Sequence, residues 1–155
     1  MKDKKLRNYL IAIIVISILL SLKTIYDNRE RSLADVMKYN QRDFNSLLFT
    51  QNIKEYKFKS DNWWSTHDNE PVEELMAFLS QYRVKKIKED EFNQRNKNEI
   101  GIEFAIFNYV KDSKVVGIHE NTVDLDIGEY YIVLNGPIDM EWISNYHEKY
   151  RELYD

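Results

Sequence analysis

Three histidines are the residues best suited to acid–base or metal chemistry in this chain, because it contains no cysteine. Each is followed by a carboxylate, but adjacent side chains point to opposite faces of a strand and diverge by about 100° on a helix. None of these pairs therefore forms a ready-made dyad, and no H-x-x-x-H or H-E-x-x-H spacing indicates a metal site. We interpret them as unrelated surface or loop histidines that hold no metal or cofactor. They stand in the dipeptides His67-Asp68, His119-Glu120 and His147-Glu148.

Motifs for other chemistry are absent from the sequence or incomplete. Its four glycines are scattered, so no phosphate-cradling loop is expected, and no motif of a serine nucleophile occurs. The segment from Asp124 through Asp126 to Gly128 superficially resembles a calcium loop, but it lacks the third oxygen ligand and the glutamate at position twelve. We interpret it as the solvated face of a strand. The alternative enzymatic function is a small hydrolase that uses His67 or His119 with a carboxylate.

The best candidate for binding is aromatic. Trp63 and Trp64 lie in the polar stretch 57–69, just before Pro71. Tryptophan is favoured at interfaces because a rigid amphipathic ring buries much area at a small entropic cost. Either both rings anchor a loop to the core, or one is buried and the other faces a partner. We take Trp63, Trp64, His67 and Asp68 as the candidate partner surface, and expect Trp64→Ala to weaken partner binding without changing the thermal midpoint.

The elements that position these residues begin with a segment able to cross a membrane. Four basic residues among the first seven precede an uncharged run, Tyr9–Leu22, that contains ten Leu, Ile or Val residues. These ten favour the bilayer by about 3–6 kcal/mol in total. The run spans about 21 Å, so flanking residues must extend it across a hydrocarbon core of about 30 Å. We expect residues 1–26 to be an uncleaved anchor, 27–31 a polar stalk and 32–155 a single domain.

Cleavage of this segment as a secretory signal is the alternative, since its charged start and length suit one. Ser17 and Ser21, however, are separated by the bulky Leu19 and Leu20, which does not match an A-x-A-like cleavage site. The density of basic residues at the N-terminus favours a cytoplasmic start and a domain outside the cell membrane. As many basic residues follow the run as precede it, so a domain that faces the cytoplasm stays a second alternative.

The charge of the expected domain excludes some partners. The leader carries a formal +3, and the whole chain carries −4, so residues 23–155 carry −7. An acidic domain of this kind is not expected to bind nucleic acid or to lie flat on anionic lipid.

Within the domain, hydrophobic periodicity predicts helices and strands. Ser32 to Asp35 has the form of a helix start, and Pro71 suits the first turn of a helix that ends near Tyr82. A last amphipathic helix follows Pro137, with Ile138, Trp142, Ile143, Tyr146, Tyr150 and Leu153 on its apolar face. Glu89 to Glu99 contains a single apolar residue and is expected to be a loop.

The strands are expected to form an antiparallel sheet with a meander of about four strands. Its central strand is 100–110, and a two-residue turn between 115–119 and 122–127 pairs Ile118 with Val123 and Val116 with Leu125. Further strands are expected at 46–50, at 53–59 and at a lysine-rich edge, 84–88. The predicted fold class is therefore α+β, with two or three helices packed on the sheet.

The sequence resembles one class of proteins in three features. These are a lysine-rich start, an Ile/Leu anchor without a lipid-attachment cysteine, and the segment Tyr-Tyr-Ile-Val-Leu134 before a helix rich in Trp and Tyr. The class is that of the short, single-pass, surface-exposed proteins of low-GC Gram-positive bacteria, most of unknown function. The resemblance implies no activity and no site residues. We expect a non-enzymatic binding or assembly module that is tethered to the cell membrane and contacts another envelope protein.

Overall fold

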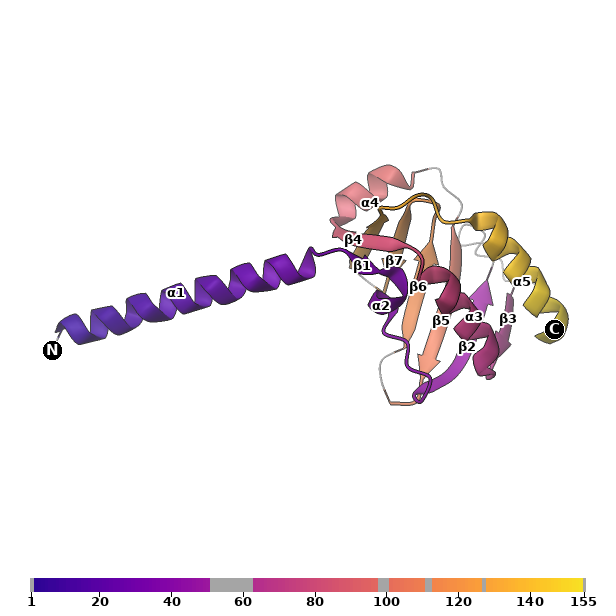
Figure 1. The fold of residues 1–155 in the computed structure, drawn as a ribbon, viewed down its shortest axis with the longest axis horizontal. Helices are drawn as coiled ribbons and strands as arrows, with labels where there is room; N and C mark the ends of the chain where they lie inside the picture. The colour runs from indigo at the N-terminus through magenta and orange to yellow at the C-terminus, as the bar shows by residue number, and fades with distance from the viewer. Residues whose placement is uncertain (1, 51–62, 98–100, 111–112, 127, 155) are drawn as a thin grey trace.

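The computed structural model describes residues 2–50, 63–97, 101–110, 113–126 and 128–154. An N-terminal helix, α1 (Lys2–Asp27), stands apart from an antiparallel sheet with several helices (Figure 1). The sheet has eight strands in the order β1-β4-β8-β7-β6-β5-β2-β3. The predicted α+β class is confirmed, although the eight strands are more than the four of the predicted meander.

Helix α1 is long and apolar enough to cross a membrane. Its apolar part, Arg7–Tyr26, has 20 residues, which span about 30 Å at 1.5 Å per residue. The uncharged run ends at Leu22, so the residues after it supply the length that the run alone lacks. None of this span is buried inside the protein, and Ile13 and Leu20, for example, are 60% and 61% exposed. The helix therefore presents apolar side chains to its surroundings on all sides.

The centre of the sheet is the predicted meander. Its strands are β5 (Ile102–Asn108), β6 (Lys114–Ile118), β7 (Thr122–Leu125) and β8 (Glu129–Val133), and they are neighbours in this order. Ile118 pairs with Val123 and Val116 with Leu125, which confirms the predicted register. All four side chains are buried, because this register places them together on the face that carries the core.

Four more strands widen the sheet on both sides. On the β5 side lie β2 (Phe44–Thr50) and then β3 (Trp63–Thr66). On the β8 side lie β4 (Arg83–Ile87) and the two-residue β1 (Arg31–Ser32), which pairs only with the start of β4. The predicted strand at 46–50 is thus confirmed, and the one at 53–59 lies outside the described residues. The lysine-rich strand β4 was predicted at the sheet edge, but β1 is the edge strand and β4 lies next to it.

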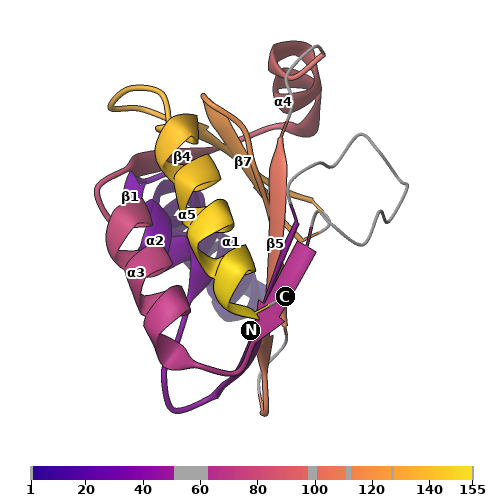
Figure 2. The same ribbon diagram turned by 90° about the vertical axis from the view of Figure 1, so that its right-hand side faces the viewer.

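Three helices cover one face of the sheet (Figure 2). They are α2 (Leu33–Met37), α3 (Asn69–Leu79) and α5 (Met140–Tyr154). Pro71 lies in the first turn of α3, and the predicted apolar face of this helix is buried, although the helix ends at Leu79 rather than near Tyr82. The face of the sheet beneath these helices is the core face.

The prediction of a loop at 89–99 is wrong for its first part, because α4 (Glu89–Arg95) is a helix. Three acidic residues in its first turn favour the helix dipole, and an ion pair joins Glu91 to Arg95 at 2.9 Å. Its one buried residue, Phe92, packs against Tyr130 of β8 with ring centroids 4.7 Å apart. Helix α4 lies at one end of the sheet, on the side away from α3 and α5 (Figure 2).

Aromatic rings from three adjacent strands form the centre of the core. Phe49 of β2 stacks between Trp64 of β3 and Phe104 of β5, with centroids 5.5 Å and 5.8 Å away and interplanar angles of 5° and 4°. The strand register places these three residues directly opposite one another, which brings the rings together. Helix α5 covers the stack with Tyr146 and Tyr150.

The apolar face of α5 differs from the prediction at two positions. Leu153 was expected to be buried and is 66% exposed, whereas His147 is fully buried. The helix also begins at Met140, two residues after the buried Ile138. His147 takes the buried place because its ring stacks on Phe49, with centroids 5.6 Å apart.

Candidate functional site

The two adjacent tryptophans lie in a strand, not in the expected loop, and they have opposite environments. Residues 63–66 pair with β2 from Thr50 to Leu47, so their side chains alternate between the two faces of the sheet. Trp63 is 40% exposed, whereas Trp64 is 1% exposed on the core face. The choice of Trp64 as an exposed contact residue is therefore wrong, since its ring has no surface to offer a partner.

Trp64 instead forms a buried hydrogen bond that sequence reasoning missed. Its indole Nε1–H donates to Nδ1 of His147 at 3.0 Å. Because Nδ1 accepts, the neutral His147 carries its proton on Nε2, which is buried without a hydrogen-bond partner among the described residues. Burial, aided by the positive charge of Arg151, lowers the pKa of His147 below its ordinary value. The expectation of a surface or loop histidine is wrong here.

His67 and Asp68, which follow β3, form hydrogen bonds with Asn45 and Tyr154. Both are exposed, and Nδ1 of His67 donates to the carbonyl oxygen of Asn45 at 2.9 Å. The Asp68 carboxylate accepts a 2.8 Å hydrogen bond from the hydroxyl of Tyr154, the last residue of α5. Of the four residues proposed from sequence, Trp64 and Asp68 thus pack against α5, while Trp63 extends from the opposite face.

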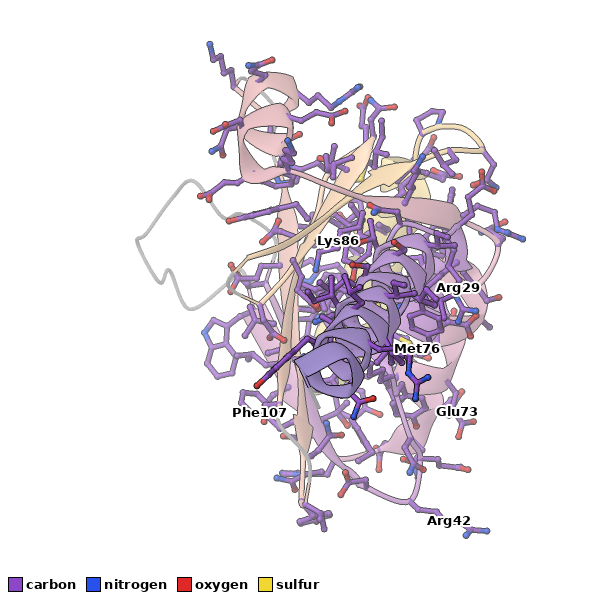
Figure 3. The ribbon with its side chains drawn as sticks, turned by 90° about the vertical axis from the view of Figure 1, so that its left-hand side faces the viewer. Arg29, Arg42, Glu73, Met76, Lys86 and Phe107 are labelled. Atoms are coloured by element: carbon purple, nitrogen blue, oxygen red, sulfur yellow. The ribbon has the colours of Figure 1, made fainter. Side chains whose placement is uncertain are left out.

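Of the described helices, only α4 covers the face of the sheet opposite the core face, at one end, and we call this face the open face. Paired residues share a face in an antiparallel sheet, so the register of β3, β2, β5 and β6 identifies its side chains. Three large apolar side chains on it are exposed: Trp63 by 40%, Phe107 by 37% and Val115 by 43%. Figure 3 shows Phe107 on the other side of the sheet from Glu73 and Met76 of α3.

Two carboxylates lie at the middle of the open face. Glu103 of β5 pairs with Gly117 of β6, and Gly117 pairs with Asp124 of β7. A side-chain carbon added to Gly117 would overlap the Asp124 carboxylate, with the carboxyl carbon only 2.8 Å away. The Asp124 side chain therefore lies across the glycine, toward Glu103. Burial, together with the negative charge of Asp124, raises the pKa of Glu103 above its ordinary value.

His119 lies beside these carboxylates, where the hairpin register predicts a cross-strand pair. Its Nε2 is 3.7 Å from Oδ1 of Asp124, so the two form an ion pair only when the ring is protonated, and the distance is too long for a hydrogen bond. Phe92 of α4 packs edge-on against the ring, which leaves His119 buried rather than on the surface as expected. Nδ1 of His119 is buried without a partner among the described residues.

The acidic groups of the open face do not form a ligand set for a metal ion. Across the described ranges, no three His, Asp or Glu side chains are close enough to hold one. Asp126 is engaged elsewhere, because its carboxylate pairs with the ammonium of Lys114 and accepts the backbone N–H of Val115 at 3.0 Å. It therefore does not act together with Asp124, as the two would in a calcium loop.

Glu103 is the site residue that sequence reasoning did not select. The sequence does contain a signal for it, since Glu103 and Asn108 are the polar residues of an otherwise apolar central strand. A charge at such a position costs free energy unless it is compensated. The partner strand that sets Asp124 near it becomes apparent only when the β5–β6 and β6–β7 registers are combined.

No protein-family model, curated protein sequence or solved structure matches this chain.

Proposed function

We propose that this chain is a non-enzymatic binding module, tethered by α1 to the cell membrane with its domain outside, whose open face contacts another envelope protein. One observation carries the proposal: three helices cover the core face, but the open face exposes Trp63, Phe107 and Val115. Exposed apolar side chains that gather on one face are typical of a surface that binds a partner. The 20-residue apolar span of α1 supports the tether.

The orientation rests on charge. The four basic residues among the first seven favour a cytoplasmic N-terminus, which places the domain outside. The acidic domain would be repelled by anionic headgroups, so a protein is a better partner for the open face than the lipid surface.

Photo-crosslinking in intact cells tests the contact. A photoreactive amino acid at Phe107 of the full chain is expected to give one discrete crosslinked species, because this position is on the contact surface. Leu153 is the matched control, since it is even more exposed but lies on α5. Trp63→Ser should reduce the Phe107 adduct without lowering the amount of protein, since an exposed side chain contributes little to stability. Equal adducts from both positions, or none from Phe107, would contradict the proposal.

A small hydrolase is the second candidate function, and the approach of His119 to Asp124 at 3.7 Å favours it over the other histidines. His67 is the poorer base, because its Nδ1 already bonds to the Asn45 carbonyl. A hydrolase requires that His119→Ala abolishes turnover of any substrate that the membrane-bound protein cleaves. Unchanged turnover in that variant and in His67→Ala excludes this function.

A further inference from the structure

Among the described residues, no lysine or arginine pairs with the two carboxylates of the open face, Glu103 and Asp124. His119 lies 3.7 Å from Asp124 and compensates its charge only when the ring is protonated. Asp124 adds negative charge beside Glu103, so the two repel each other on a half-buried surface. Such an arrangement costs free energy unless a positive charge from outside the described residues compensates it.

The surroundings of this pair restrict what kind of cation fits. Gly117 has no side chain, and the Asp124 carboxylate occupies the space above it. Trp63 belongs to the same cross-strand row as Glu103, two strands away through Thr50, which corresponds to about 10 Å. Phe107 and Val115 are exposed farther along the same face. A lone ion would use only the carboxylates and would leave these apolar side chains exposed.

We infer that the open face binds a protein segment that places a lysine or arginine side chain between Glu103 and Asp124, and apolar side chains against Phe107 and Val115. The inference rests on the proposed function and names the chemistry of its partner. Charge complementarity supports it, since residues 23–155 carry −7 and no lysine or arginine of the described ranges pairs with the carboxylates at the centre of this face. Trp63 adds a ring on which a guanidinium group can stack.

A defined peptide tests this chemistry. The full chain in nanodiscs of uncharged phosphatidylcholine is titrated with a hexapeptide of alternating arginine and valine, with blocked ends, and binding is measured by calorimetry. The matching glutamate–valine hexapeptide and empty nanodiscs are the controls. We expect the arginine peptide alone to bind, and its affinity to fall as salt concentration rises.

The paired variant Glu103→Gln with Asp124→Asn should weaken binding by about tenfold, since hydrogen bonds to charged groups are lost. The pair Glu120→Gln with Glu152→Gln changes the net charge equally at exposed positions elsewhere, and should bind as wild type does. An equal loss of peptide affinity in both paired variants overturns the inference. So does the absence of detectable binding to wild type at about 1 mM peptide, because even a weak complex would be seen at that concentration.

The two proposals fail in different ways. If Trp63→Ser removes binding but the Glu103→Gln and Asp124→Asn pair does not, the open face is a contact surface without a cation site. Binding of the glutamate peptide to the open face would also mean a contact surface without a cation site. It would overturn the inference of a lysine or arginine partner but not the proposed function. If the Phe107 crosslink is absent in cells, the proposed function itself is wrong.

Discussion

Gly117 determines where the Asp124 carboxylate lies, although it contributes no side chain. A Cβ at this position would meet the carboxyl carbon of Asp124 at 2.8 Å, closer than packed atoms approach. Gly117→Ala should therefore push the Asp124 carboxylate aside and destabilise the fold by at most about 1 kcal/mol, because the end of this partly exposed side chain can rotate away. Shortening Asp124 to alanine removes the clash, so the double variant should be more stable than Gly117→Ala alone. Denaturant unfolding of the full chain in detergent measures this coupling, and simple additivity would contradict the geometry.

His147 makes stability depend on pH. Its folded pKa lies below the unfolded value of 6.5, so the unfolded chain takes up a proton first as pH falls. Stability is therefore full above pH 6.5 and falls below it, by at most about 1.4 kcal/mol per pH unit, until pH reaches the folded pKa. His147→Gln keeps an acceptor for Trp64 but does not titrate. The difference between the two pH profiles isolates this residue, and parallel profiles would refute its role.

The adjacent tryptophans show what residue-level reasoning can predict. Alternation along a strand says that one ring of an adjacent pair is buried and the other exposed. Alternation does not say which of the two rings is buried, because this depends on the register of β3 with β2. In that register Trp64 is opposite Phe49 and stacks on its ring in the core. The buried hydrogen bond to His147 could not be predicted either, since its two partners lie 83 residues apart in the chain.

Among the elements, α4 packs on the sheet through one buried side chain. Phe92 contacts the rings of His119 and Tyr130, and it is the buried residue of this helix. Phe92→Ala should cost at most about 3 kcal/mol and release α4 from the sheet. Hydrogen exchange should then be faster in 89–95 but unchanged in the β6–β7 hairpin.

Glu91→Gln is the control for this variant. It removes the exposed ion pair with Arg95, which is worth only about 0.3–0.5 kcal/mol, and leaves Phe92 in place. Exchange in α4 should stay close to that of wild type. A similar increase in both variants would mean that charges on the helix, rather than the phenylalanine, keep α4 folded.

The elements differ in how well the sequence predicts them. The register of the β6–β7 hairpin was predicted correctly, because a two-residue turn allows one register that places Val116, Ile118, Val123 and Leu125 on a single face. Helix α4 was missed because a helix with one apolar residue has no hydrophobic period to detect. The width of the sheet was also missed, since β1 and β3 are short strands whose pairing is tertiary.

For the whole molecule, α1 and the folded domain divide the chain into two parts with different solvent preferences. The apolar side chains of α1 are exposed along the full span from Tyr9 to Tyr26, whereas those of the domain are mostly buried. Transferring ten Leu, Ile and Val residues from water into a bilayer would release about 3–6 kcal/mol, and the span is long and apolar enough to cross one. In a bilayer, the basic residues Arg7 and Lys23 would limit how far the helix can slide.

We therefore expect the full chain to sediment with membranes and to stay in the membrane pellet after an alkaline carbonate wash. Only detergent should extract it, because detergent micelles also surround the apolar side chains of α1. Protease added to intact cells should remove the domain and leave a fragment that contains residues 1–26, identified by mass spectrometry. Permeabilised cells are the control, in which a domain facing the cytoplasm would become cleavable for the first time. Full-length chain in the soluble fraction, or a secreted form without the leader, would exclude a tether, and then the open face would act in solution rather than at the membrane.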